Sequence, residues 1–236
     1  MLKYSFALVL VLIPSCAANQ GTRPEDMSAS QHSAAADQEM RAAEGHDSQY
    51  RPLAADEKER CERLTTVGLA CWTSRVNPTT QHTKDAEEHR RLAAKHRAAS
   101  AALAAAEQRS CAGVEEGERD TSPFYHREDI TSVSVITESA KGAYNTDSGA
   151  GPVGARVVFR AVPGVTAEWL QHVVDCHLAR AAAAGHDMAE MGYCPLVLPN
   201  VRARVESTGD GFAVDVTSGD VEIVKEIIRR AQLLRG

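Results

Sequence analysis

Side chains that could bind a soft metal ion lie close together between residues 165 and 196. Cys176 and Cys194 bracket part of this stretch, and His172 precedes Cys176 by four residues. Residues four apart share one face of a helix, so His172 and Cys176 could bind the same ion. Thiolate, thioether and imidazole ligands together suit Cu(I), whereas thiolate with imidazole suits zinc. The full candidate set is His172, Cys176, His186, Met188, Met191 and Cys194.

The same two cysteines could instead form a structural disulfide. Apolar residues at three- and four-residue steps predict a helix that starts after Thr166 and stops at Gly185. The segment from Gly185 to Cys194 is long enough, when extended, to return Cys194 to the side of Cys176. We favour a Cys176–Cys194 disulfide in an oxidising compartment, with the methionines filling space and the histidines at the surface.

A second group of histidines follows one side of a long alanine-rich helix, which the sequence predicts over residues 83–110. His82, His89 and His96 are spaced seven residues apart. Each step spans about 10.5 Å of helix, so no two of them can bind one ion without ligands from another element. His126 or a cysteine of a facing helix could supply such ligands. The alternatives are a solvated polar face and a packing element that responds to pH.

Catalytic motifs do not stand out in the chain. Cys111 and Ser122 lack a recognisable nucleophile motif around them, and the glycines at 149–151 and 209–211 are typical of turns, not of phosphate-binding loops. We therefore expect a non-catalytic protein that needs no cofactor, with copper or zinc as the alternative.

Residues 1–16 have the pattern of an export signal. Lys3 precedes an apolar run, residues 6–13, which is too short to span a bilayer. Residues 12–16 end in Cys16 and resemble the lipobox of bacterial lipoprotein precursors. The resemblance implies cleavage before Cys16 and acylation of that cysteine. By resemblance to lipoprotein sorting in Gram-negative bacteria, Ala17 favours the outer membrane, facing the periplasm, over the inner membrane.

Other segments extend this resemblance. Residues 89–100, 122–130 and 175–180 are similar to segments of uncharacterised lipoproteins from Gram-negative bacteria. The resemblance covers most of the chain after residue 80, and it implies no activity.

Composition limits the partners. The net charge is −6 and there is no block of five or more basic residues, which argues against nucleic acid as a partner. Six cysteines suit an exported protein. We expect contact with a membrane through the N-terminal lipid, and with another protein or a second copy of the chain.

The patterns predict four regions. These are a signal peptide (1–15), a lipid-anchored disordered tether (16–53), a helical hairpin (54–120) and an α+β domain (121–236). The tether has few large apolar residues to offset the entropy of ordering, so we expect its His32 and His46 to be solvated. In the hairpin, a helix over residues 56–72 would pack against the long helix.

In the last region, residues 121–236, two strands and a helix are predicted to follow one another twice. Strands are predicted over residues 131–137 and 155–162, followed by the helix that starts after Thr166. Two further strands, residues 201–206 and 212–217, flank a glycine turn, and Asp220 caps a final helix. This order predicts an antiparallel sheet with both helices on one face, a two-layer α+β fold.

Function is less constrained than fold. The leading interpretation is a lipid-anchored cell-envelope protein that acts as a non-catalytic binding or interaction module. One alternative is a periplasmic copper or zinc protein that uses the cysteine, histidine and methionine set. Another is a protein that assembles with a second chain through pH-sensitive histidines on the long helix.

Overall fold

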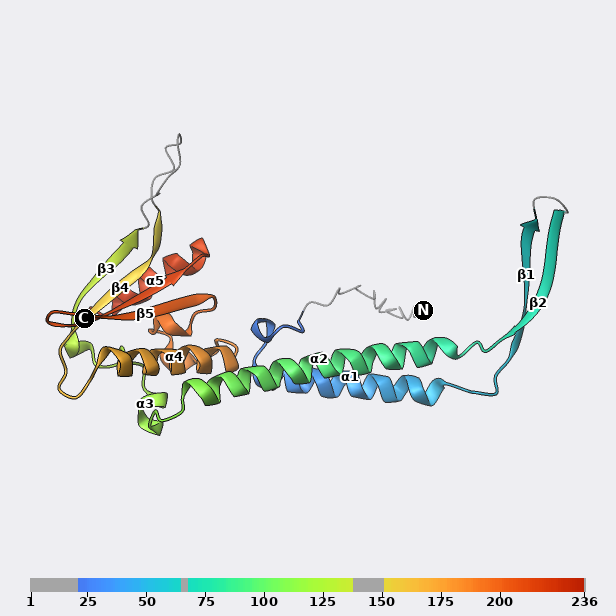
Figure 1. Ribbon diagram of the computed structural model, residues 1–236, viewed down its shortest axis with the longest axis horizontal. Coiled ribbons are helices and arrows are strands. Elements are labelled where there is room, and N and C mark those ends of the chain that lie inside the picture. Colours follow the sequence, from blue (N-terminus) through green and yellow to red (C-terminus); the bar gives the residue numbers. More distant parts are fainter. Residues whose placement is uncertain (1–20, 65–67, 138–150, 236) are drawn as a thin grey trace, which may run out of the picture.

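The molecule is elongated, with a small sheet at each end of a pair of long helices (Figure 1). The computed structural model describes residues 21–64, 68–137 and 151–235. The predicted signal peptide and Cys16 lie outside these ranges. None of the described helices combines the length and the apolar character needed to cross a bilayer.

The two long helices, α1 (Ala29–Gln49) and α2 (Thr80–Ser110), pack side by side and are called the stalk here. Helix α2 confirms the predicted long helix, starts three residues earlier than expected, and is about 46 Å long at 1.5 Å per residue. At the start of α1, the Ser28 hydroxyl accepts the Gln31 N–H, and the Gln31 side chain accepts the Ser28 N–H. This reciprocal capping box satisfies two backbone donors of the first turn.

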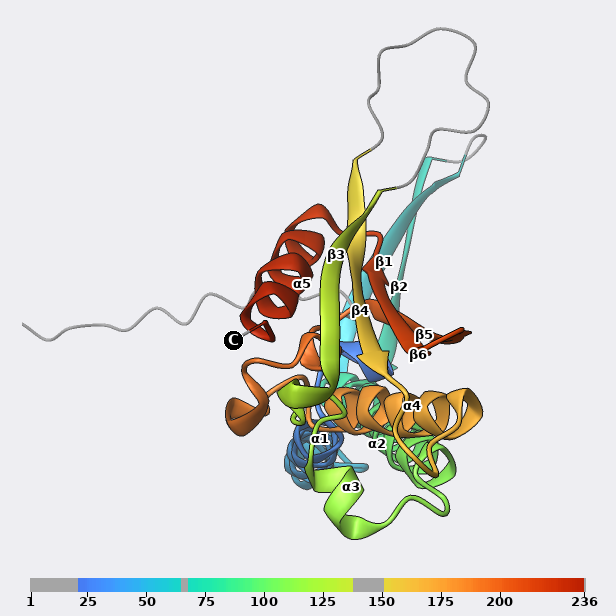
Figure 2. The same ribbon diagram turned by 90° about the vertical axis from the view of Figure 1, so that its left-hand side faces the viewer.

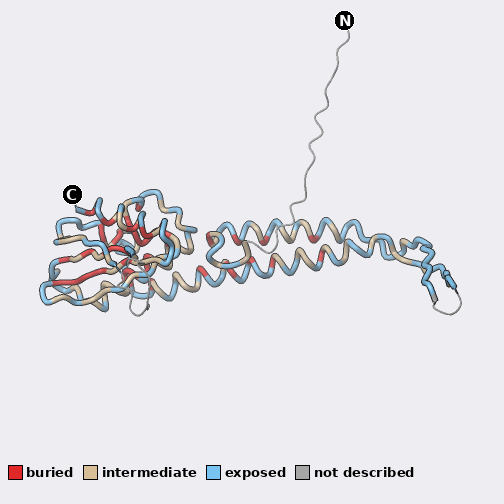
Figure 3. The backbone as a smooth tube through the Cα atoms, turned by 90° about the horizontal axis from the view of Figure 1, so that it is seen from above, coloured by how far each residue is buried: buried red, intermediate tan, exposed pale blue. Residues whose placement is uncertain are grey.

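Helix α1 replaces most of the predicted disordered tether, so that prediction is wrong for residues 29–49. Ala36 and Ala43 of α1 are at most 1% exposed, and Ala86 and Ala93 of α2 are fully buried. Alanine favours helix, and its small side chain lets two helix backbones approach closely. The pairing therefore needs no large apolar residue, and buried positions recur along both helices (Figure 3).

A two-stranded ribbon, β1 (Asp56–Leu64) and β2 (Gly68–Val76), joins the two stalk helices. The helix predicted over residues 56–72 is therefore wrong, and α1 takes its place as the first arm of the hairpin. The charged residues of β1 favour a helix, but along a helix Cys61 and Cys71 would lie about 15 Å apart. In the ribbon they lie directly opposite each other and form a disulfide, which holds the two strands together.

Residues 121–235 form the C-terminal domain, and its main elements follow the predicted order of two strands, a helix, two strands and a helix. They are β3 (Ile130–Thr137), β4 (Pro152–Arg160), α4 (Ala167–Ala183), β5 (Val201–Thr208), β6 (Gly211–Ser218) and α5 (Val221–Leu233). The four strands form one antiparallel sheet in the order β3-β4-β6-β5. The predicted α+β class is confirmed. Short helices complete the chain: η1 (Pro24–Asp26), α3 (Glu116–Asp120), η2 (Arg127–Asp129), η3 (Ala189–Met191) and η4 (Pro195–Val197).

The core of this domain lies on one face of the sheet. Val157 of β4 pairs with Val214 of β6, and both side chains are fully buried because alternate residues of a strand point to the same face. Helix α4 adds Val174 to this core and α5 adds Ile227, both also fully buried. Figure 2 shows α5 beside the sheet and α4 between the sheet and the stalk. The opposite face carries Arg156 and its carboxylate partners.

Helix α4 fastens the C-terminal domain to the stalk. Cys111, at the end of α2, is disulfide-bonded to Cys176 of α4. Arg180 of α4 forms an ion pair with Asp120 at 2.8 Å and lies 3.8 Å from a carboxylate oxygen of Glu107 on α2. The domain is therefore joined to α2 covalently as well as by charge.

Candidate functional site

Histidines line the contact between the two stalk helices. The three histidines that were predicted to share one side of α2 do so, and each meets a polar side chain of α1. His82 Nδ1 lies 3.1 Å from His46 Nδ1, His89 Nδ1 lies 2.6 Å from Glu39 Oε2, and His96 Nδ1 lies 3.0 Å from His32 Nδ1. These three pairs are called the histidine seam here. Buried alanines of both helices lie between them along the chain.

Two members of the seam, His32 and His46, were expected to be solvated, and that expectation is wrong. The sequence does contain a signal for them. His32, Glu39 and His46 are seven residues apart, which is also the spacing of the histidines on α2. Two segments with the same seven-residue period can pair along their whole length. The side chains that face the α2 histidines therefore come from α1, and not from residues 56–72.

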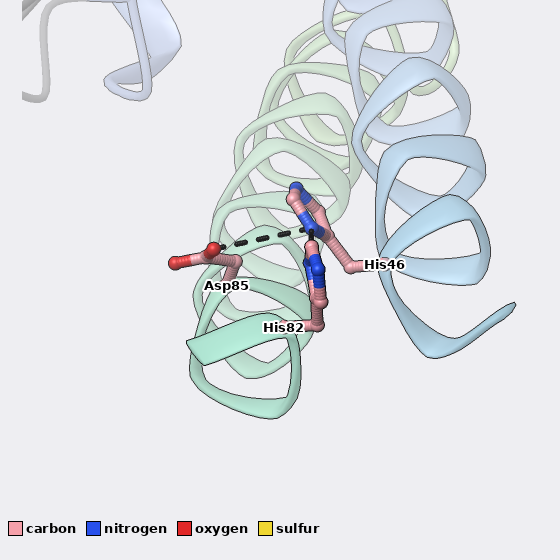
Figure 4. A group of neighbouring side chains, drawn as sticks. All are labelled: His46, His82 and Asp85. Carbon is pink, nitrogen blue, oxygen red and sulfur yellow. Dashed lines mark hydrogen bonds and ion pairs between the residues drawn. The ribbon is translucent and has the colours of Figure 1, made fainter. Parts of the chain in front are cut away.

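At the ribbon end of the stalk, His46, His82 and Asp85 point toward one another (Figure 4). His46 Nδ1 lies 3.9 Å from Asp85 Oδ2, and one ligand atom from each of the three side chains lies within 4.8 Å of the others. The His46 ring stacks on the His89 ring, with centroids 5.3 Å apart. Nitrogen and oxygen donors from facing helices thus converge on one point, which is a geometry that suits a metal ion.

At the other end of the seam, His32 and His96 form a buried pair. The His32 Nε2–H donates to the carbonyl of Arg23 at 2.9 Å, so the Nδ1 atom of this ring faces His96 without a proton when the ring is neutral. Burial lowers the pKa of His96, and the nearby His32 lowers it further. The neutral form of the His96 ring is therefore favoured.

His126 lies apart from the seam, in the C-terminal domain, where its Nδ1 is 3.2 Å from Glu128 and its ring is exposed. The prediction that it could join a cluster with His82, His89 and His96 is wrong. Helix α1 of the same chain covers the α2 histidines, so α1 occupies the face through which a second chain was predicted to assemble.

The cysteines of the first candidate set pair differently from the prediction. Cys176 bonds to Cys111, and Cys194 is a free, fully buried thiol, so the predicted Cys176–Cys194 disulfide is wrong. After Gly185 the chain turns through short helices and carries Cys194 into the domain core, where the Ser122 hydroxyl donates to its sulfur at 3.2 Å. Burial raises the pKa of this thiol, which keeps it protonated.

The remaining members of the set do not form a metal site. The His172 Nε2–H donates to the carbonyl of Ala112 at 2.9 Å, and the His186 Nδ1–H donates to the carbonyl of Val197 at 2.8 Å. Met191 is buried in the core and Met188 packs against it. With the sulfur of Cys176 in a disulfide and that of Cys194 in the core, the copper or zinc site predicted here is wrong.

A cavity of about 390 Å³ opens in the C-terminal domain between the start of α4, the end of β4 and the segment around α3. Its apolar lining residues, called the apolar wall here, are Phe159, Val162, Val165, Trp169, Leu170, Val173 and Phe212. The remaining lining residues are mostly polar and are called the polar wall: Gly117, Glu118, Thr121, Ser122, Pro123, His126 and Asp129. Volumes of about 300–1,000 Å³ with mostly apolar walls are typical of small-molecule sites.

Charge on the polar wall is acidic. Asp129 accepts from the Arg160 guanidinium at 2.7 Å, which neutralises it. Glu118 is exposed, and its carboxylate has no ion-pair partner among the described residues. The sequence did not indicate this cavity, because its walls come from segments that are far apart in the chain.

We compared the chain with models of protein families, with curated proteins and with solved structures, and none of them matches it.

Proposed function

We propose that this chain is a cell-envelope protein that binds a small apolar molecule, without transforming it, in the cavity of its C-terminal domain. The observation that carries the proposal is the cavity itself, whose lining combines apolar side chains such as Phe159 and Trp169 with the acidic residue Glu118. Apolar side chains left accessible in a hollow of this size gain free energy when an apolar ligand displaces water.

The walls define the class of ligand. The aromatic and aliphatic wall fits a hydrocarbon chain or ring. The carboxylate of Glu118, another lining residue, favours a polar end that is neutral or positively charged, and disfavours an anionic one. The proposed ligand is therefore an apolar molecule with a neutral or cationic end.

Binding without catalysis is supported by the state of the polar groups around the cavity. The Ser122 hydroxyl donates to Cys194 and accepts the Phe124 N–H, so it is not paired with a histidine that could activate it. His126 pairs with Glu128 at the surface. Among the described lining residues, no hydroxyl forms a hydrogen bond to a histidine side chain.

The envelope location rests on two kinds of support. The lipobox-like residues before Cys16 predict export and lipidation, most simply at the outer membrane facing the periplasm. Two disulfides, Cys61–Cys71 and Cys111–Cys176, suit an oxidising compartment. In such a protein, the stalk would hold the C-terminal domain at a distance from the ribbon.

Displacement of a fluorescent apolar probe tests the proposal. The full chain without its signal peptide should bind N-phenylnaphthylamine saturably at one site, and dodecylamine should displace the probe at lower concentration than dodecanoate does. The two competitors share one hydrocarbon chain, so the difference reports the charge at the polar end. Glu118→Gln should reduce that difference and leave probe binding intact.

A matched pair of variants locates the binding. Val165 lines the cavity, whereas Val221 is 68% exposed at the start of α5 and does not line it. Val165→Glu should weaken probe binding about tenfold or more, since it places a charge in the apolar wall, and Val221→Glu should leave it unchanged. Equal binding by both variants, or no saturable binding by the unaltered chain, would contradict the proposal.

A further inference from the structure

We propose that His46, His82 and Asp85 form a binding site for one divalent zinc-like ion, which fastens α1 to α2 at the base of the ribbon. His46 lies in the last turn of α1, and the other two residues lie in the first turns of α2. The site is at the opposite end of the stalk from the cavity (Figure 1), so it is independent of the function proposed above.

The spacing of the donor atoms is close to that of a zinc site. Zinc–nitrogen and zinc–oxygen bonds of about 2.0–2.2 Å in a tetrahedron place neighbouring donor atoms roughly 3.3–3.5 Å apart. The two Nδ1 atoms are 3.1 Å apart, and His46 Nδ1 is 3.9 Å from Asp85 Oδ2. Small side-chain rotations would bring all three donors to bonding distance of one ion, and Figure 4 shows them aimed at a common point.

Neighbouring side chains hold these donors in place. Gln81 Nε2 donates to Asp85 Oδ1 at 2.7 Å, which leaves the other carboxylate oxygen free to face His46. The His46 ring lies between the rings of His82 and His89, with centroids 5.4 and 5.3 Å away. Such outer contacts orient the ligands of a metal site before the ion arrives.

The donor set selects the ion. Two imidazoles and one carboxylate suit zinc, and they leave a fourth position for water. Calcium requires six to eight oxygen ligands, and Cu(I) prefers sulfur. The other group of potential ligands in the described chain is Glu59 with Cys61 and Cys71, but both sulfurs there are in a disulfide. The cluster on the stalk is therefore the zinc site we propose.

Calorimetry and cobalt spectroscopy test this site in the tag-free, disulfide-bonded chain. Zinc chloride should bind at one equivalent per chain and raise the melting temperature. Cobalt(II) at one equivalent should give the intense visible absorption of a tetrahedral ion. His82→Ala and Asp85→Asn should each weaken zinc binding about tenfold or more.

Two variants serve as matched controls. Asp37 is exposed on α1, and His172 bonds a backbone carbonyl at the other end of the stalk. Asp37→Asn and His172→Ala should therefore bind zinc as the unaltered chain does. No saturable zinc binding, or the same affinity in all four variants, would overturn the site.

X-ray absorption on the zinc complex of the unaltered chain identifies the atoms bonded to zinc. This measurement tests the site even if a variant fails to fold. A first shell of two imidazole nitrogens and light oxygen donors supports the site. A shell that contains sulfur, or only one imidazole, overturns it.

Discussion

At the scale of single residues, one buried histidine, His96, makes the stalk sensitive to acid. His96 is buried against His32, and its pKa in the folded chain lies below the ordinary value of 6.5. In the unfolded chain the same ring takes up a proton near pH 6.5. As the pH falls below 6.5 the unfolded state therefore binds more protons than the folded state, and the free energy of unfolding decreases. His177, whose pKa burial also lowers, acts in the same direction in the C-terminal domain.

A double variant isolates the contribution of the stalk. His32→Leu together with His96→Leu replaces both partners of the buried pair with apolar groups, so neither ring is left without its partner. We expect this variant to lose less stability than the unaltered chain between pH 7.5 and pH 5.5 in urea denaturation. Because His177 remains, part of the pH dependence should persist. An identical pH dependence in the two proteins would contradict the role of the pair.

A glycine at the junction between the domain and the stalk gives a second residue-scale prediction. Gly185 has a φ of +70°, and a Cβ atom there would lie 3.0 Å from the Cβ and 3.1 Å from the backbone nitrogen of Ser28. Gly113 also has a positive φ, of +83°, but nothing lies within 4 Å of its Cβ position. Gly113→Ala should cost about 1–2 kcal/mol from backbone strain alone.

Gly185→Ala should cost more than Gly113→Ala, because it adds a contact with the cap of α1 to the same backbone strain. Urea denaturation of the two variants measures the difference. Equal losses would show that α1 does not begin against the end of α4.

At the scale of elements, the sequence predicted secondary structure best in segments that have a clear periodic pattern of apolar and polar residues. The strands and helices of the C-terminal domain alternate apolar and polar residues with clear periods, and all of them form. The charged segment 56–64 favours helix by composition, and only its pairing with residues 68–76 makes it a strand. Helix α1 was not predicted because its buried apolar residues are alanines, and alanines do not give a recognisable hydrophobic face in the sequence.

The candidate sites were harder to predict than the elements. Which cysteine pairs with Cys176 depends on how α2 docks on α4, and no local spacing contains that information. The histidines of α2 were recognised, whereas their partners on α1 required a comparison of the seven-residue periods of two segments.

The two disulfides should differ in their effect on global stability. Cys111–Cys176 closes a loop of 65 residues between the stalk and the domain, so Cys111→Ala with Cys176→Ala should cost about 4 kcal/mol. Cys61–Cys71 lies in an exposed ribbon, whose opening leaves the rest of the fold intact. Cys61→Ala with Cys71→Ala should therefore cost less than about 1 kcal/mol in the main unfolding transition. A larger loss from the ribbon pair than from the junction pair would reverse this account.

At the scale of the whole molecule, the stalk makes the chain long and narrow. A compact chain of this length has a radius of gyration of about 18 Å. Helix α2 alone, with 31 residues, is about 46 Å long, and the ribbon and the domain lie at its two ends (Figure 1). Small-angle X-ray scattering of the monomer should give a clearly larger radius and a distance distribution with a long tail. A symmetric distribution near the compact value would mean that the ribbon end folds back onto the domain.

The two proposed sites lie at opposite ends of the molecule: the apolar ligand binds in the C-terminal domain, and the zinc ion binds at the ribbon end of the stalk. Both disulfides and the ion pairs of Arg180 connect elements that would otherwise move independently. The stalk thus separates the ribbon from the C-terminal domain, whereas α1 begins beside that domain, close to Gly185.

The most direct test of ligand binding uses the tryptophan in the cavity wall. Trp169 lines the cavity, and Trp72 lies in the ribbon, so Trp72→Phe leaves Trp169 as the only tryptophan of the full chain. Titration with dodecylamine should shift the Trp169 emission to shorter wavelength and saturate at one equivalent, and Val165→Glu should abolish the shift. An emission spectrum that does not change with ligand, or that changes equally in Val165→Glu, would contradict the proposed function.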